Sequence, residues 1–81
     1  MDTIYTEQHK LLIRILQAER KRAGMTQTQL AQRMNMTQGT ISQIELGQRR
    51  VLVTEFLDLA VVLGFDPEAV MRQIDNVDGS I

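Results

Sequence analysis

The most constraining feature of this sequence is the segment from Thr26 to Gly47, whose capping residues leave room for only two short helices. Thr26 can cap a helix with its hydroxyl, and Gln29, three residues later, completes a capping box. Asn35 then interrupts the pattern, because asparagine is the non-glycine residue best suited to the left-handed end of a helix. Thr37 can cap a second helix, which Gly47 closes. The segment therefore predicts two short helices joined by a tight turn.

The rest of the chain also favours helices, because apolar residues recur at spacings of three and four. Capping residues and glycines mark where these helices begin and end. We expect one helix from about Thr6 to a cap at Gly24, another from about Thr54 to Gly64, and a last helix that opens at Asp66. The expected fold class is all-α, a compact domain of five helices.

Length and composition limit what the chain can form. Its 81 residues, 43% of them apolar, can bury one modest core. We expect an N-terminal segment with the start of the first helix in residues 1–11, the domain in 12–74, and a flexible tail in 75–81. The sequence has no cysteine, no signal-peptide pattern and no apolar run of membrane-spanning length. We therefore expect a cytoplasmic protein.

The charges are unevenly distributed. A formal net charge of −1 argues against nucleic-acid binding when taken alone. Residues 10–50, however, carry eight basic and two acidic residues, whereas residues 51–81 carry one basic and six acidic residues. This pattern predicts a basic face and an acidic C-terminal part, with ordinary solvated charge as the alternative interpretation.

The chain resembles the phage Cro/repressor-type (XRE-like) helix-turn-helix proteins, whose small all-helical domains bind operator DNA. The pattern RxxxGxTQxxLAxxxxxTQxxISxxExG, from Arg20 to Gly47, carries the resemblance, which extends over roughly residues 12 to 65. Two positions depart from the family. Asn35 stands where members commonly have glycine, and Gly39 stands where a base-reading side chain is often found.

The helix between Thr37 and Gly47 is the expected DNA-reading element. Its outward face is small, rich in amides and uncharged, a composition that suits hydrogen bonding to base edges. The resemblance implies that this helix lies in the major groove. Gly39 would then let the backbone approach DNA closely, unless it is simply tolerated in a first turn. The candidate base-reading residues are Gln38, Gly39, Thr40, Ser42 and Gln43.

The resemblance also implies phosphate contacts around this helix, because the preceding helix would point its N-terminus at the DNA backbone. By the resemblance, Gln27 would clamp both a phosphate and Gln38; an ordinary surface amide is the alternative. The resemblance places Arg49 and Arg50, which follow Gly47, along the DNA backbone; a solvated pair of arginines is the alternative. The candidate phosphate-binding residues are Arg22, Thr26, Gln27, Thr37, Arg49 and Arg50.

The family pattern also pairs Arg20 with Glu45, and we interpret this ion pair as structural.

The helix from about Thr54 to Leu63 is apolar nearly all round, so part of it is expected to meet a second copy of the chain. The expected dimer interface consists of Val51, Leu52, Val53, Phe56, Val61, Val62, Val70, Met71 and Ile74.

The resulting prediction is a sequence-specific transcriptional regulator, a repressor that acts as a homodimer on double-stranded DNA. An enzyme is disfavoured, since the sequence offers one histidine, no cysteine and no recognisable catalytic frame, and we expect no cofactor and no metal site. The main alternative is an antitoxin or adaptor that binds a second protein partner through its acidic, apolar C-terminal third. Salt dependence separates these readings, because DNA binding weakens steeply with salt.

Overall fold

Four helices begin at a residue whose side chain accepts a hydrogen bond from a backbone N–H group of the first turn. The hydroxyl of Thr6 accepts a hydrogen bond from His9 N. In the same way, the hydroxyl of Thr26 accepts from Gln29 N, and that of Thr37 accepts from Thr40 N. Asp66 caps the last helix through a bond from Glu68 N. These contacts span two or three residues, so the sequence pattern alone could locate them.

The computed structural model describes residues 6–77, which form five helices and no strand. The helices are α1 (Glu7–Arg22), α2 (Gln27–Met34), α3 (Gln38–Glu45), α4 (Val53–Leu63) and α5 (Pro67–Asp75). The predicted all-α fold class is confirmed. Helix α4 begins one residue earlier than the sequence predicted, and α5 includes Asp75, which had been assigned to the flexible tail. The rest of that tail, beyond residue 77, lies outside the described residues.

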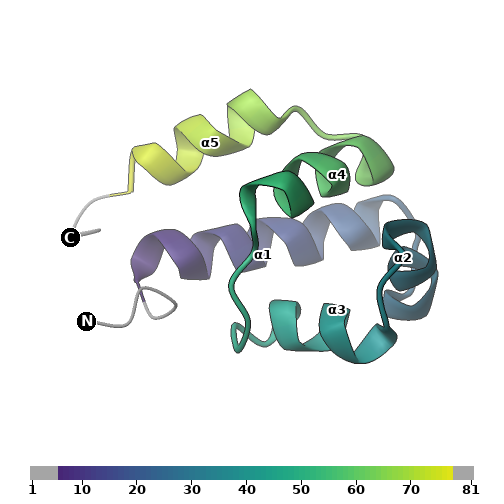
Figure 1. Ribbon diagram of the computed structural model, residues 1–81. Coiled ribbons are helices and arrows are strands. Elements are labelled where there is room, and N and C mark those ends of the chain that lie inside the picture. The colour runs from purple at the N-terminus through teal and green to yellow at the C-terminus, as the bar shows by residue number, and fades with distance from the viewer. Residues whose placement is uncertain (1–5, 78–81) are drawn as a thin grey trace.

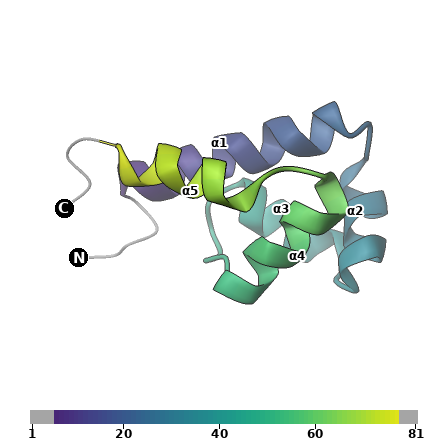
Figure 2. The same cartoon turned by 90° about the horizontal axis from the view of Figure 1, so that it is seen from above.

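The helices pack around one core (Figures 1 and 2). Helix α1 runs behind α4, while α5 lies above α1 and α3 below it, with α2 at one end. Contacts join α2 to α3 and α4, and α1 to α3 and α5. The core draws side chains from the first four helices: Ile13, Leu16, Leu30, Ala31, Ile41, Ile44, Leu59 and Leu63. This arrangement leaves α3 at the lower edge of the molecule with one side open.

Near the C-terminal end of α4, Gly64 has a φ of 80°, the left-handed conformation that the sequence predicted for this helix end. The chain then turns back into α5, and the ring of Phe65 packs 5.7 Å from that of Phe56. Among the helices of residues 6–77, none combines the length and apolar character needed to cross a membrane.

Candidate nucleic-acid interface

Helices α2 and α3 form the predicted helix-turn-helix unit. Both parts of the capping box at the start of α2 are present, since Gln29 N donates to Thr26 Oγ1 (3.1 Å) and Thr26 N donates to Gln29 Oε1 (2.8 Å). Asn35 has a φ of 56°, the left-handed backbone conformation, which is uncommon for residues other than glycine. Met36 N closes the turn by donating to Ala31 O (2.9 Å). Asparagine therefore does here what glycine commonly does in the family.

Helix α3 has a fixed inner side and an open outer side. Ile41 and Ile44 are almost completely buried against the core. Of the five candidate base-reading residues, Gln38, Gly39 and Gln43 are exposed. The other candidates, Thr40 and Ser42, are half-buried, and the hydroxyl of Thr40 lies 3.0 Å from that of Thr37. Three of the five candidates are therefore exposed on α3, and the other two are half-buried.

Gly39 is not required by the fold. Its φ is not in the left-handed region, and a Cβ added to it would meet only Thr37 Oγ1, at 3.8 Å, an ordinary van der Waals distance. No contact within the described chain requires glycine at this position. Glycine in the first turn of a helix nevertheless lowers the stability of the helix relative to alanine. The reason for it therefore has to lie outside the domain or in tolerance of that cost.

A chain of hydrogen bonds connects the core to the outer side of α3. Arg20 Nε donates to Glu45 Oε2 (2.7 Å) and a terminal nitrogen of Arg20 donates to Glu45 Oε1 (3.0 Å). The same Oε1 accepts from Gln27 Nε2 (3.1 Å), and Gln27 Oε1 accepts from Gln38 Nε2 (2.8 Å). We call this the Arg20–Gln38 relay. The expected pairing of Gln27 with Gln38 is present, whereas the bond from Gln27 to Glu45 was not predicted.

The ion pair at the inner end of the relay is buried. The side chains of Arg20 and Glu45 are only 13% and 6% exposed. The hydrogen bond to Glu45 is the main reason why the pKa of Arg20 is raised above its usual value. Arg20 also donates to Met25 O (2.9 Å), and Gln17 Nε2 donates to Glu45 O (2.7 Å). This geometry supports the structural interpretation of the pair, because it ties α1 to the end of α3.

The phosphate candidates divide into two groups. Thr26, Gln27 and Thr37 lie at the N-terminal ends of α2 and α3, where backbone N–H groups favour an anion. Arg50 is exposed in the loop before α4. These four residues lie in the helix-turn-helix unit or in the loop that follows α3.

Arg49 has a structural partner that the sequence analysis missed. Its two terminal nitrogens donate to the two carboxylate oxygens of Glu55, each at 2.9 Å. Glu55 Oε1 also accepts from Leu52 N (3.0 Å), which caps α4 in place of a side chain at Leu52. The hydrogen bonds from Arg49 lower the pKa of Glu55, and the Leu52 N–H adds to the shift against the effect of burial. Arg49 thus fixes the start of α4, and a phosphate would compete with Glu55 for it.

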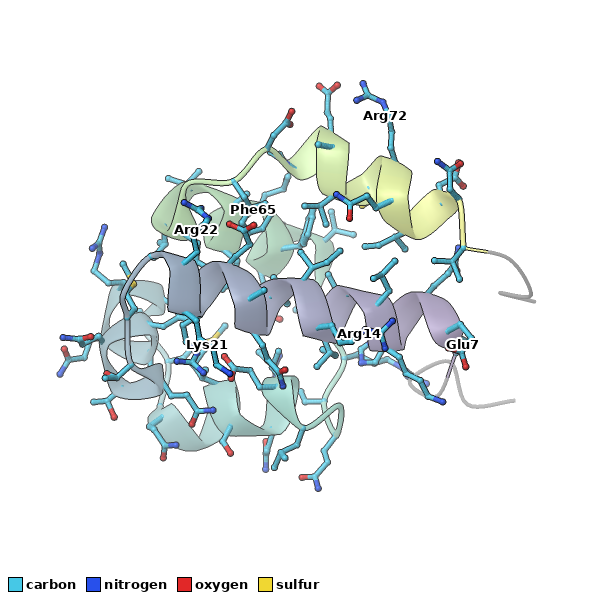
Figure 3. The ribbon with its side chains drawn as sticks, turned by 180° about the vertical axis from the view of Figure 1, so that it is seen from behind. Glu7, Arg14, Lys21, Arg22, Phe65 and Arg72 are labelled. Atoms are coloured by element: carbon cyan, nitrogen blue, oxygen red, sulfur yellow. The ribbon has the colours of Figure 1, made fainter. Side chains whose placement is uncertain are left out.

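Arg22 is held by contacts within the domain. Arg22 Nε donates to Glu19 Oε1 (2.7 Å), and a terminal nitrogen donates to Leu63 O (3.1 Å) at the end of α4. Figure 3 shows Arg22 near Phe65, on the edge of α1 away from α3, and Lys21 on the opposite edge. Adjacent residues on a helix point about 100° apart. The sequence alone does not show how α1 packs against the other helices, so it could not show which of the two side chains lies toward α3. Lys21, on the edge of α1 toward α3, is a further phosphate candidate.

A separate apolar surface lies on α4 and α5. Val53, Leu57 and Val61 repeat every fourth residue along α4 and are all exposed, and Met71 of α5 is exposed as well. Val53, Leu57 and Met71 border a groove of about 480 Å³ together with Phe56, Pro67, Glu68 and Arg72. We call the exposed residues Leu52, Val53, Leu57, Val61 and Met71 the apolar surface.

The residues expected at a dimer interface differ in how far the domain itself buries them. Phe56 and Val70 are buried within the domain, so they belong mainly to its core. Val51 and Val62 pack against the core and are half-exposed, as is Ile74. Leu57, which the sequence analysis omitted, is exposed where Phe56 had been expected.

Comparisons with known proteins agree with this geometry. A family model described as helix-turn-helix (HTH_3) matches residues 16–70. The solved structure of an XRE-family like protein from Pseudomonas syringae pv. tomato str. DC3000 is similar, with a TM-score of 0.77 and 33% sequence identity over 85% of this chain and 86% of that chain. A search of curated proteins gave no match.

Proposed function

Since the chain belongs to the XRE-type helix-turn-helix family of DNA-binding transcription regulators, we propose that it is a repressor that binds a near-palindromic operator as a homodimer. The observation that carries the proposal is the outer side of α3. There an exposed row of amide and small residues is held on a helix whose inner side is locked into the core. A regulator of the cell's DNA would work in the cytoplasm, as the sequence analysis expected.

In this proposal α3 enters the major groove. Gln38 and Gln43 supply amides, which can bond adenine at two positions, and Gly39 allows the helix backbone to approach the base edges. Thr40 and Ser42 line the same contact. Thr26, Gln27, Thr37, Lys21 and Arg50 would contact phosphates, which position the domain without reading sequence.

A homodimer follows from the small size of this reading surface. One eight-residue helix contacts too few base pairs to select a genomic site by itself. The apolar surface lies on α4 and α5, and α3 lies at the lower edge of the molecule (Figure 1), so two copies could pair through the former and leave both α3 helices exposed. Two-fold pairing would place the reading helices about 34 Å apart, one turn of DNA.

Selection of bound fragments from random duplex DNA tests the proposal. We expect a near-palindrome with half-site centres roughly 10 bp apart, and loss of tight binding when about 5 bp are inserted between the half-sites. Val61→Lys should weaken dimerisation and operator binding together, whereas the control Thr28→Lys, on an exposed position of α2, should leave sedimentation unchanged. Undiminished binding after the insertion, or a monomer at binding concentrations, would exclude the dimer.

The apolar groove favours a second candidate function, an antitoxin or adaptor that uses it to bind a different protein. Its border carries Glu68 and Arg72 beside the apolar residues, so both charge signs are available at the rim. An apolar protein interface depends little on salt, whereas DNA binding falls steeply between 50 and 200 mM salt, by orders of magnitude for about six phosphate contacts. Salt titration of the dominant interaction distinguishes the two.

A further inference from the structure

The Arg20–Gln38 relay has a direction that the buried carboxylate dictates. An ionised carboxylate only accepts hydrogen bonds, whereas an amide side chain has one accepting and one donating end. Glu45 faces Gln27 at 3.1 Å, so Gln27 must turn its nitrogen toward Glu45. The oxygen of Gln27 then faces Gln38 at 2.8 Å, and Gln38 must turn its nitrogen toward Gln27. Reversing either amide would bring two acceptors or two donors together.

The order of groups that Gln38 offers to DNA is therefore fixed inside the domain. One of the two hydrogens on Gln38 Nε2 is used by Gln27, which leaves the second hydrogen and Oε1 for another partner. These form an acceptor beside a donor. Adenine presents the matching pair in the major groove, a donor at N6 and an acceptor at N7.

We propose that Glu45 is a specificity-determining positioning residue, which sets through Gln27 the order in which Gln38 presents its acceptor and donor to a base. The inference rests on the proposed function, since it concerns how the DNA-reading surface discriminates. Glu45 touches no base itself: it is buried, and it holds its own orientation through two bonds from Arg20. Without the relay, the amide of Gln38 could turn by 180° and accept bases that need the opposite order.

The first experiment uses the unbound protein and needs no variant. Nuclear Overhauser contacts from the side-chain amide hydrogens report which end of each glutamine faces its neighbour. We expect the Nε2 hydrogens of Gln27 near Glu45 and those of Gln38 near Gln27. Amides that turn freely, or that point the other way, would overturn the inference without bearing on DNA binding.

The second experiment measures base preference with the selected operator. The position read by Gln38 is the one at which Gln38→Ala loses preference; affinities are then compared for the preferred and the exchanged base pair there. Gln27→Met keeps similar length and leaves the Arg20–Glu45 pair intact. We expect the ratio of the two affinities to fall by about fivefold or more, the lower end of what one bidentate contact discriminates. Loss of a phosphate contact alone would weaken both duplexes equally and leave the ratio unchanged.

A double-mutant cycle connects the effect to Glu45. Glu45→Ala should lower the same ratio in the parent and have no further effect on it in the Gln27→Met background. Gln17→Ala is the matched control, because it removes a 2.7 Å bond to the backbone oxygen of Glu45 and leaves the carboxylate in place. Its ratio should equal that of the parent even if its melting temperature falls.

The possible results distinguish a failure of the proposed function from a failure of the relay alone. If the parent shows no base preference at any position, the proposed function fails and the specificity role of Glu45 fails with it. A parent that selects an operator, with a Gln27→Met variant that keeps the full ratio, overturns the relay alone. Should Glu45→Ala prove too unstable to measure, the Gln27→Met ratio and the amide orientations still decide.

Discussion

Replacing Gly39 by alanine should stabilise the free domain and weaken its binding to DNA. In the structure the new Cβ would meet only Thr37 Oγ1, at 3.8 Å, so the methyl group finds open space. Alanine is favoured over glycine within a helix by about 1 kcal/mol, and by less in the first turn, where Gly39 lies. We therefore expect a gain of several tenths of a kcal/mol, roughly 2 to 5 °C in melting temperature for a domain of this size.

The same methyl group should be unfavourable at the DNA. If the backbone of α3 approaches the base edges at Gly39, the added group overfills a close contact, which typically costs about 1 to 3 kcal/mol, or roughly 5- to 150-fold in affinity. Thermal unfolding and binding to the selected operator measure the two effects on one protein sample. Gln73→Ala, on an exposed position of α5, which lies on the other side of α1 from α3 (Figure 1), provides the control and should bind the operator like the parent.

Thermal unfolding tests the space around Gly39 in the free domain, and operator binding tests the close approach of α3 to DNA. A lower melting temperature for Gly39→Ala would contradict the open space that the structure shows around this position. Higher stability with unchanged operator affinity would mean that Gly39 is merely tolerated in the first turn, and the close approach to DNA would be abandoned.

Three further predictions follow from the same geometry. Gln38→Ala should lose about 1 to 3 kcal/mol of binding free energy at the preferred site and flatten the base preference. Arg50→Ala should instead weaken binding to specific and random DNA alike and reduce the slope of the salt dependence by about 1. If Gln38→Ala lowered the affinity for all DNA sequences equally, base reading by Gln38 would be excluded. Glu45→Ala should destabilise the domain by about 3 to 5 kcal/mol, because it leaves Arg20 buried without its partner, while Glu68→Ala, which removes an exposed pair, should melt like the parent. Because the folded-state pKa of Glu55 is lowered, its contribution to stability is present above the unfolded value of about 4.3 and is lost as the pH falls through the folded value. Denaturant unfolding from pH 6 to 3 should therefore show a smaller decline in Glu55→Gln than in the parent; parallel curves would contradict the shift.

The helix boundaries could be predicted from the sequence because they depend on local contacts. The hydroxyls of Thr26 and Thr37 reach backbone groups three residues away, and the left-handed turn at Asn35 depends on the conformational preference of that residue. Such features involve few residues that are close in sequence, so no knowledge of the fold is needed to place them.

The orientation of α4 could not be predicted, for a physical reason. Hydrophobic periodicity identifies the buried side of a helix only when the other side is polar. In α4 nearly every residue is apolar, so the sequence did not distinguish Phe56, which is buried, from Leu57, which is exposed. The contacts that Arg49 makes with Glu55 and Gln27 makes with Glu45 were likewise invisible, since both depend on how loops and helices meet in three dimensions.

The pairing of charges within the domain bears on how it could bind DNA. Arg20, Arg22 and Arg49 each lie within 3.0 Å of a carboxylate, so three of the eight basic residues in positions 10–50 are neutralised locally. A phosphate contact by any of them would have to replace an existing ion pair. The sequence-independent attraction to DNA is therefore weaker than the count of basic residues suggests. If the domain binds an operator as proposed, its affinity should depend more on base contacts by α3 and on the pairing of two copies, which would double those contacts on a two-fold operator.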